Sequence, residues 1–265
     1  MGENENNYLY HYTNYIALKG ILENKELWLS NVRSMNDTSE MLHFMKCLRL
    51  AVKRECIGKE AEVDSLFDNQ IERLKKEQAY SLSLSELYDD AAQWERYAND
   101  GKGVLIKFNV GKLKELLDNR KLVLQKIFYR DDVSNHQVKA DIVLYILEGH
   151  TFDFNSIDGA FENAWASSVA FKHSSFKNEK EKRIMLMSFF AKYYEEEPKY
   201  NMEDWGIREY YPLKIVDDNN NLIPGLIEEI MIGPRAYYPE GVFERYLEKI
   251  GLDSIKICYS KCPLR

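Results

Sequence analysis

The first residues that could do chemistry lie between Tyr8 and Asn31, in the segment YLYHYTNYIALKGILENKELWLSN. His11 stands inside a short aromatic run that is typical of a β-strand, and Thr13 follows two positions later. A neutral imidazole both donates and accepts hydrogen bonds, so it can hold a sugar hydroxyl, and Thr13 adds a second hydroxyl. The alternative is a histidine with a structural role only.

A second candidate is the charged run from Glu179 to Arg183, which directly precedes the apolar run from Ile184 to Met187. If a strand begins near Glu179, alternation places Glu179, Glu181 and Arg183 on one face. The arginine can then hold one carboxylate ionised while the other acts as an acid or base. The competing interpretation is a solvated run in which charges four residues apart form pairs.

A third candidate is the pair Trp94 and Tyr97, which a turn of Gly101, Lys102 and Gly103 follows. Aromatic residues three apart on a helix usually belong to the core. We expect Trp94 to pack there, because a large aromatic ring buries most of its area, and we expect Tyr97 to face a pocket. The glycines indicate a turn, although glycine also lets a backbone approach a phosphate.

Asn36, Asp37 and Glu40 form a further polar cluster. The favoured interpretation is a helix cap, because asparagine and aspartate satisfy the first free backbone N–H groups of a helix. The alternative places Asp37 in a cleft that faces His11.

Composition excludes several classes of protein. Of the 265 residues, 45% are hydrophobic and 13% are aromatic, which excludes a largely disordered chain. The net charge of −7 argues against an extended nucleic-acid grip through phosphates. The four cysteines form no CxxC pair, so we expect no metal site, and no signal peptide or membrane span is predicted. These features predict a cytoplasmic protein with free thiols.

The elements that would position these residues follow from the hydrophobic periodicity. Asn14 can cap a helix whose apolar side carries Ile16, Leu18, Ile21 and Leu22. Asp89 or Asp90 can cap the short helix of Trp94 and Tyr97. Strands are predicted at 8–12, 27–30, 79–85 (as a half-buried strand), 104–108, 122–129, 184–190, 211–215, 227–232 and 255–259. Further helices are predicted after 36–40 and at 60–76, 141–150, 161–172 and 242–250.

These strands and helices alternate without a regular βαβ rhythm, and no linker or internal repeat divides the chain. The sequence therefore predicts one α+β domain over residues 1–265, with a disordered tail at 1–7 and a mixed or mostly antiparallel sheet. Neither a G-x-G-x-x-G segment after a strand nor a Walker A loop is present.

The chain resembles a bacterial family of uncharacterised proteins that share a domain of unknown function. The resemblance rests on motifs that occur in order along nearly the whole chain: LYHYT, LWLSN, MNDTSE, SLS, WERYANDGKGVLIKF, FKNEKEKRIM, EEIMIGP and SKCPLR. The chain departs from the family pattern at Lys182 and Leu264, where that pattern favours aromatic residues.

The family in turn is distantly similar to ADP-ribosyltransferases, which implies that fold and NAD as the substrate. His11 matches their first-strand histidine, and Glu181 matches their catalytic glutamate. Tyr80 or the segment from Ser81 to Ser83 matches their aromatic or serine-rich second strand, and Tyr97 competes with Tyr80 for the role of the aromatic that packs on nicotinamide. The resemblance implies catalytic roles for Glu181, His11 and Tyr97, and NAD contacts from His11, Tyr12, Thr13, Tyr80, Ser81, Ser83, Glu179 and Arg183.

In such enzymes the glutamate binds the 2′-hydroxyl of the nicotinamide ribose and stabilises the positive charge that develops as the glycosidic bond breaks. A preorganised charge of this kind supplies about 3–4 kcal/mol to the transition state. The acceptor of ADP-ribose is a protein side chain, a nucleic-acid base or water, and the resemblance implies a toxin or phage-defence context.

Two other classes of function compete with this one. The same fold can serve as a non-catalytic module that binds a nucleotide or a partner. A nuclease or phosphotransferase is disfavoured, because we expect few arginines and lysines in the site.

Overall fold

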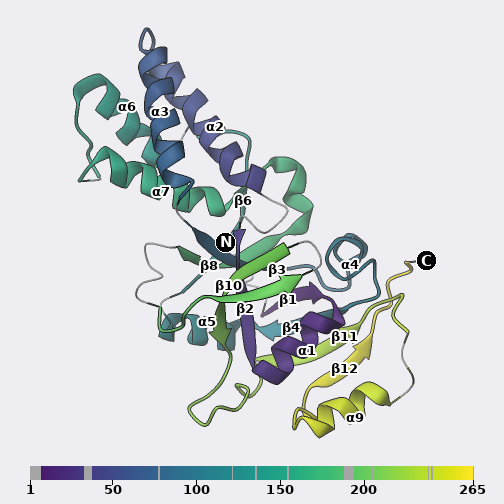
Figure 1. The fold of residues 1–265 in the computed structure, drawn as a ribbon. Helices are drawn as coiled ribbons and strands as arrows, with labels where there is room; N and C mark the ends of the chain where they lie inside the picture. Colours follow the sequence, from purple (N-terminus) through teal and green to yellow (C-terminus); the bar gives the residue numbers. More distant parts are fainter. Residues whose placement is uncertain are drawn as a thin grey trace.

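The structure is a computed structural model. It describes residues 7–32, 38–76, 78–120, 122–134, 136–153, 155–187, 194–203, 206–237, 239 and 241–264. Figure 1 shows two lobes, one built of long helices and the other built around a large sheet with shorter helices at its sides. Asn36 and Asp37, predicted as a helix cap, lie outside the described residues.

The sheet lobe is an open, mostly antiparallel sheet of ten strands. They are β1 (Tyr8–Thr13), β2 (Glu26–Asn31), β3 (Ala79–Ser85), β4 (Val104–Asn109), β5 (Val123–Lys126), β8 (Glu181–Met187), β9 (Lys199–Glu203), β10 (Gly206–Lys214), β11 (Ile227–Ile232) and β12 (Lys256–Tyr259). Eight follow the order β12-β11-β4-β1-β3-β2-β10-β9, while β8 pairs with β3 and β5. Among the described strands of this sheet, only β11 and β12 pair in parallel. The prediction of an α+β fold with a mixed, mostly antiparallel sheet is confirmed.

Helices α1 (Tyr15–Asn24), α5 (Val110–Asn119) and α9 (Val242–Lys249) contribute to the core of this lobe, which is built on aliphatic side chains of the central strands. The Oδ1 atom of Asn14 accepts a hydrogen bond from Ala17 N at 2.8 Å, so the predicted cap of α1 is confirmed. Ile16 does not lie on the apolar side of α1 as predicted. It is 86% exposed, whereas Leu18, Ile21 and Leu22 are buried.

The helical lobe consists of α2 (Thr38–Glu55), α3 (Glu60–Leu74), α6 (Gln137–Glu148) and α7 (Ile157–Val169). Their apolar sides enclose a second core in which Phe44, Phe67 and Phe161 are almost fully buried. A small parallel sheet of β6 (Phe128–Tyr129) and β7 (Phe171–Lys172) lies between this lobe and β8.

Several local predictions need correction. The helix predicted over 161–172 ends at Val169, and the strand predicted over 122–129 divides into β5 and β6. Strand β3 has the predicted bounds, but residues on both of its faces are buried, so it is not half-buried as predicted. Strand β8 begins at Glu181, after the 3-10 helix η2 (Ser174–Glu179), so the two glutamates do not share one strand. The sequence did not predict α5 or β9.

Candidate functional site

A cleft of about 900 Å³ opens where β1 and β2 share one edge of β3. Strand β1 pairs with β3 at Ser85 only, whereas β2 pairs with it at Tyr80 and Ser81. The residues between these two ladders therefore have no strand partner on this edge. They line the cleft, and β8 continues along the other edge of β3.

His11 fills this gap in the hydrogen-bonding ladder. Its Nδ1 atom lies 3.0 Å from the backbone oxygen of Ser83 and must donate, because a carbonyl oxygen can only accept. Burial lowers the pKa of His11 and so favours the neutral imidazole, although the hydrogen bond to Ser83 opposes this shift. In this tautomer Nε2 carries a lone pair, and it has no partner among the described residues.

Thr13 lies beside His11 in the cleft and is anchored by close backbone packing. A Cβ atom on Gly103 would lie 2.2 Å from the backbone oxygen of Thr13, so only glycine fits at position 103. A Cβ on Gly233 would meet the oxygen of Gly101 at 2.4 Å. The turn at Gly101, Lys102 and Gly103 is therefore a packing contact with β1 and with the end of β11.

Glu181 lies in the wall of the cleft and is only 6% exposed. Its Oε1 atom accepts a hydrogen bond from Arg183 Nε at 2.6 Å, and its Oε2 atom lies 3.1 Å from Lys172 Nζ. Burial alone would raise the pKa of Glu181, but the charges of Arg183 and Lys172 outweigh burial and lower it. Glu181 is therefore an ionised carboxylate at neutral pH.

Glu179 approaches the same lysine from the end of η2. Its Oε2 atom lies 2.8 Å from Lys172 Nζ, while Oε1 accepts hydrogen bonds from Tyr97 at 3.0 Å and Arg96 at 3.1 Å. Lys180, between the two glutamates, has a left-handed conformation with φ of 45°. The two carboxylates thus meet because the chain turns at Lys180, and not through alternation along one strand as predicted.

Helix α4 (Ala91–Tyr97) covers one side of the cleft and separates the roles of its two aromatics. Trp94 is fully buried and packs edge-on against Tyr12, with ring centres 5.0 Å apart, so its predicted core position is confirmed. Tyr97 lines the cleft and donates its hydroxyl hydrogen bond to Glu179. Burial, together with the charge of Glu179, raises the pKa of Tyr97, so it remains a protonated donor.

The predicted site residues divide into three groups. His11, Tyr12, Thr13, Ser81, Ser83, Tyr97, Glu179 and Glu181 all line this cleft, although they come from distant parts of the chain. Arg183 does not line the cleft, but its Nε atom donates a hydrogen bond to Glu181. Tyr80 belongs to the sheet core, where its hydroxyl donates a hydrogen bond to Glu209 at 2.9 Å.

The cleft also contains cations that the sequence did not predict. Arg96, Lys172 and Arg208 line it, which contradicts the expectation of few basic residues. The apolar pattern around Lys172 predicts the end of a helix, so no local signal indicated a buried lysine. Of these three basic residues, Arg96 is the one that the sequence could have indicated, because it lies on the predicted short helix one position before Tyr97.

The described part of the chain contains no group of three or more histidine, cysteine, aspartate or glutamate side chains placed to hold a metal ion. None of its helices combines the length and the apolar character that a membrane crossing requires.

Comparison with known proteins adds one finding. Residues 93–184 match the family model "Protein of unknown function (DUF2971)", so this part of the chain is similar to that family. The matched segment runs from α4 to β8 and includes Arg96, Tyr97, Lys172, Glu179 and Glu181, whereas His11 lies outside it. No curated protein and no solved structure matches the chain.

Proposed function

We propose that the cleft binds NAD and that the protein is an ADP-ribosyltransferase or an NAD glycohydrolase. The observation that carries the proposal is the meeting of His11, Tyr97 and the ionised Glu181 in one cleft at the divergence of β1 and β2. These are the residue types to which the resemblance assigns catalytic and binding roles.

Glu181 supplies the charge that such a reaction requires. Cleavage of the bond between nicotinamide and ribose leaves positive charge on the sugar, and a fixed carboxylate stabilises this charge more than it stabilises the bound substrate. Arg183 and Lys172 keep Glu181 ionised and fix its position. Arg183, Lys172 and the Ser83 side chain already donate to Glu181, so a ribose hydroxyl would bind by replacing the rotatable Ser83 hydroxyl.

The other side chains of the cleft suit the rest of a dinucleotide. Nε2 of His11 and the hydroxyl of Thr13 can bind ribose hydroxyls. Among the charged residues that line the cleft, Arg96, Lys172 and Arg208 outnumber the two glutamates, so the local charge is positive although the chain is acidic. A diphosphate would be attracted to this surface.

One observation favours the alternative, a non-catalytic module that binds a nucleotide or a partner. Both oxygens of Glu181 are already engaged by Arg183 and Lys172, with a second Arg183 contact from Nη2 at 3.2 Å. A carboxylate held in this way can serve to position the two cations for an anionic ligand. In that case the cleft would bind NAD or another nucleotide without cleaving it.

The test is nicotinamide release from labelled NAD, with adducts on protein and on nucleic acid followed separately. We expect Glu181→Gln to reduce kcat by about 10²-fold or more while KM changes little, because the amide keeps a hydrogen-bonding oxygen but loses the charge. Glu181→Gln will also reduce stability, since Lys172 and Arg183 lose part of their counter-charge, so its folding must be checked by thermal unfolding.

Glu229→Gln is the matched control. Glu229 is equally buried and bonded to Lys256 at 3.0 Å and Tyr88 at 2.8 Å, but it lies outside the cleft. Its substitution should cost stability and leave nicotinamide release within about threefold of wild type. If wild type releases no more nicotinamide than Glu181→Gln with any acceptor, the binding module is the better account.

A further inference from the structure

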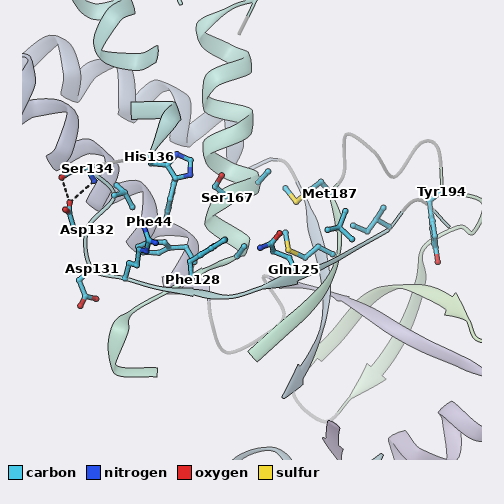
Figure 2. Close-up of a pocket in the computed structure, with 18 of the residues that line it drawn as sticks. Phe44, Gln125, Phe128, Asp131, Asp132, Ser134, His136, Ser167, Met187 and Tyr194 are labelled. Atoms are coloured by element: carbon cyan, nitrogen blue, oxygen red, sulfur yellow. Dashed lines mark hydrogen bonds between the residues drawn. The ribbon is translucent and has the colours of Figure 1, made fainter. Parts of the chain in front are cut away.

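A second cavity, of about 1110 Å³, lies between the helical lobe and strands β5 and β8. Phe44, Phe128 and Phe171 form its aromatic wall, and Met185 and Met187 line it from β8. Figure 2 shows an elongated hollow with Asp132, Ser134 and His136 at one end and Tyr194 at the other. Its volume is that of a pocket for a small organic ligand.

Large apolar groups remain open to solvent in this cavity. Phe128 is 48% exposed and Val123 is 57% exposed, although both face the hollow. Exposed apolar side chains that gather in one concave surface are typical of a binding site, whereas single exposed ones are not. Methionine side chains adapt to the shape of an occupant, and β8 supplies two of them.

The polar groups available in the cavity are mainly donors. The guanidinium of Arg130 and the hydroxyl of Ser167 have no partner among the described residues. Nδ1 of His136 accepts the hydrogen bond of Val138 N at 3.3 Å, and burial together with the nearby Arg130 lowers its pKa. The neutral imidazole therefore carries its hydrogen on Nε2, which is a third donor.

The two acidic residues at this end stay ionised, because hydrogen bonds lower the pKa of each, but neither forms an ion pair with Arg130 among the described residues. Asp131 is engaged by Ser174 and by His173 at 3.3 Å, and Asp132 accepts the Ser134 hydroxyl at 2.6 Å. In Figure 2 the carboxylate of Asp131 points away from His136. Arg130, which has no ion-pair partner among the described residues, and the neutral donors thus suit a ligand with one anionic group and an apolar ring.

We propose that this second cavity binds a small aromatic monoanion, whose ring packs against Phe128 and Phe171 and whose anionic group pairs with Arg130. The proposal does not depend on the function of the first cleft. It assigns a second ligand site to the helical side of the molecule.

The wall that separates the two sites is the small sheet of β6 and β7. Phe128 pairs with Phe171, and both line the second cavity. The next pair is Tyr129 with Lys172, and both contact Glu181: the Tyr129 hydroxyl accepts from Glu181 N at 2.8 Å. A ligand that packs against Phe128 and Phe171 therefore also restrains Tyr129 and Lys172, which contact Glu181.

The test uses two fluorescent probes that share one ring system, on the full chain. The first is 1-anilinonaphthalene-8-sulfonate, and the second is uncharged N-phenyl-1-naphthylamine. We expect one saturable site per chain, with the sulfonate bound at least tenfold more tightly, because a hydrogen bond to a charged group is worth about a factor of ten or more. Arg130→Gln should remove most of this difference, and Arg245→Gln, at an exposed site on α9, should change neither affinity.

Two substitutions on α7 test the location of the site. Ser167→Phe and Ala166→Leu both place bulk in the cavity, and each should weaken both probes at least tenfold in a variant that unfolds cooperatively. Bound sulfonate should also slow amide hydrogen exchange at residues 127–130 and 170–172. Equal affinity for the two probes, or binding that survives both α7 substitutions, would overturn the proposal.

Discussion

Two buried glutamates, Glu26 and Glu181, show how differently the same ion pairing can be built. Each has two cationic partners, and in each the charges of those partners outweigh burial and lower the pKa of the carboxyl. At Glu26 the partners are Lys199 and Lys214, at 3.1 and 2.8 Å, and the side chain of Lys199 is 45% exposed. At Glu181 the partners are almost fully buried, with the Lys172 side chain only 3% exposed.

The two clusters differ in how far their cationic side chains are buried away from water. Lysines at Glu26 keep part of their hydration, so that cluster carries a small desolvation penalty. Lys172 and Arg183 are desolvated together with Glu179 and Glu181, and such a cluster is weak evidence for stability because its penalty can exceed its Coulombic gain. A cluster of this kind in a cleft is a candidate functional site.

The largest expected effect is that of Lys172→Met. It leaves Glu179 and Glu181 facing each other without their shared cation, and breaking a buried pair in this way costs about 3–5 kcal/mol of unfolding free energy. Lys199→Met is the matched control, and it should cost less than about 1 kcal/mol because Lys214 remains and Lys199 is exposed. Urea unfolding measures the loss of unfolding free energy in both variants. Equal losses would show that burial of the cations does not distinguish the Glu181 cluster from the Glu26 cluster.

A smaller effect is expected for Tyr97→Phe, which removes one hydrogen bond to Glu179. A bond to a charged group is worth about 1 kcal/mol when the donor, like Tyr97 at 46% exposed, is partly in water. We expect this loss together with weaker NAD binding in calorimetry. Tyr200→Phe removes a similar bond to Glu209 at an exposed position and should cost less than about 0.5 kcal/mol. Unchanged stability and unchanged NAD binding in Tyr97→Phe would argue against its place in the site.

The smallest expected effect is on the pH dependence of the unfolding free energy, to which His11 and the two glutamates contribute in different pH ranges. The pKa of His11 is lowered in the folded protein, so below about pH 6.5 the unfolded chain binds a proton that the folded chain does not. Stability should therefore begin to fall as the pH drops below about 6.5. The contribution of Glu26 and Glu181 is fully present above about pH 4.5 and is lost only below it.

His11→Asn isolates this slope, because the amide can still donate to Ser83 O but does not titrate. Urea unfolding of the variant should show a flatter dependence between pH 6.5 and 5 than wild type shows. An identical slope in the two proteins would mean that His11 is not buried in its neutral form.

Local patterns in the sequence were sufficient for many elements. The alternation of β3, the Asn14 and Asp90 caps and the apolar runs of β4 and β11 depend on neighbours a few residues away. Such signals can be read from the sequence alone, because caps and periodicity act within one turn or one strand. The burial of Trp94 also followed from its size.

Pairing between distant segments could not be read in this way. Phe171 and Lys172 form a strand only because Phe128 and Tyr129 lie beside them, and their own neighbours resemble a helix. Glu179 and Glu181 meet through the left-handed turn at Lys180. The relevant contacts join residues that are far apart in the chain, so no local pattern contains them.

The sequence by itself determined the α+β composition, the position of most helices and strands, and the candidate residues His11, Tyr97, Glu179 and Glu181. Only the tertiary structure decided that these residues share a cleft, that Tyr80 turns into the sheet core instead, and that Lys172 and Arg183 hold Glu181 ionised. The physical reason is that ionisation and burial depend on the charges and atoms that surround a group in space. Those surroundings arise when β1, β3, β7 and β8 come together.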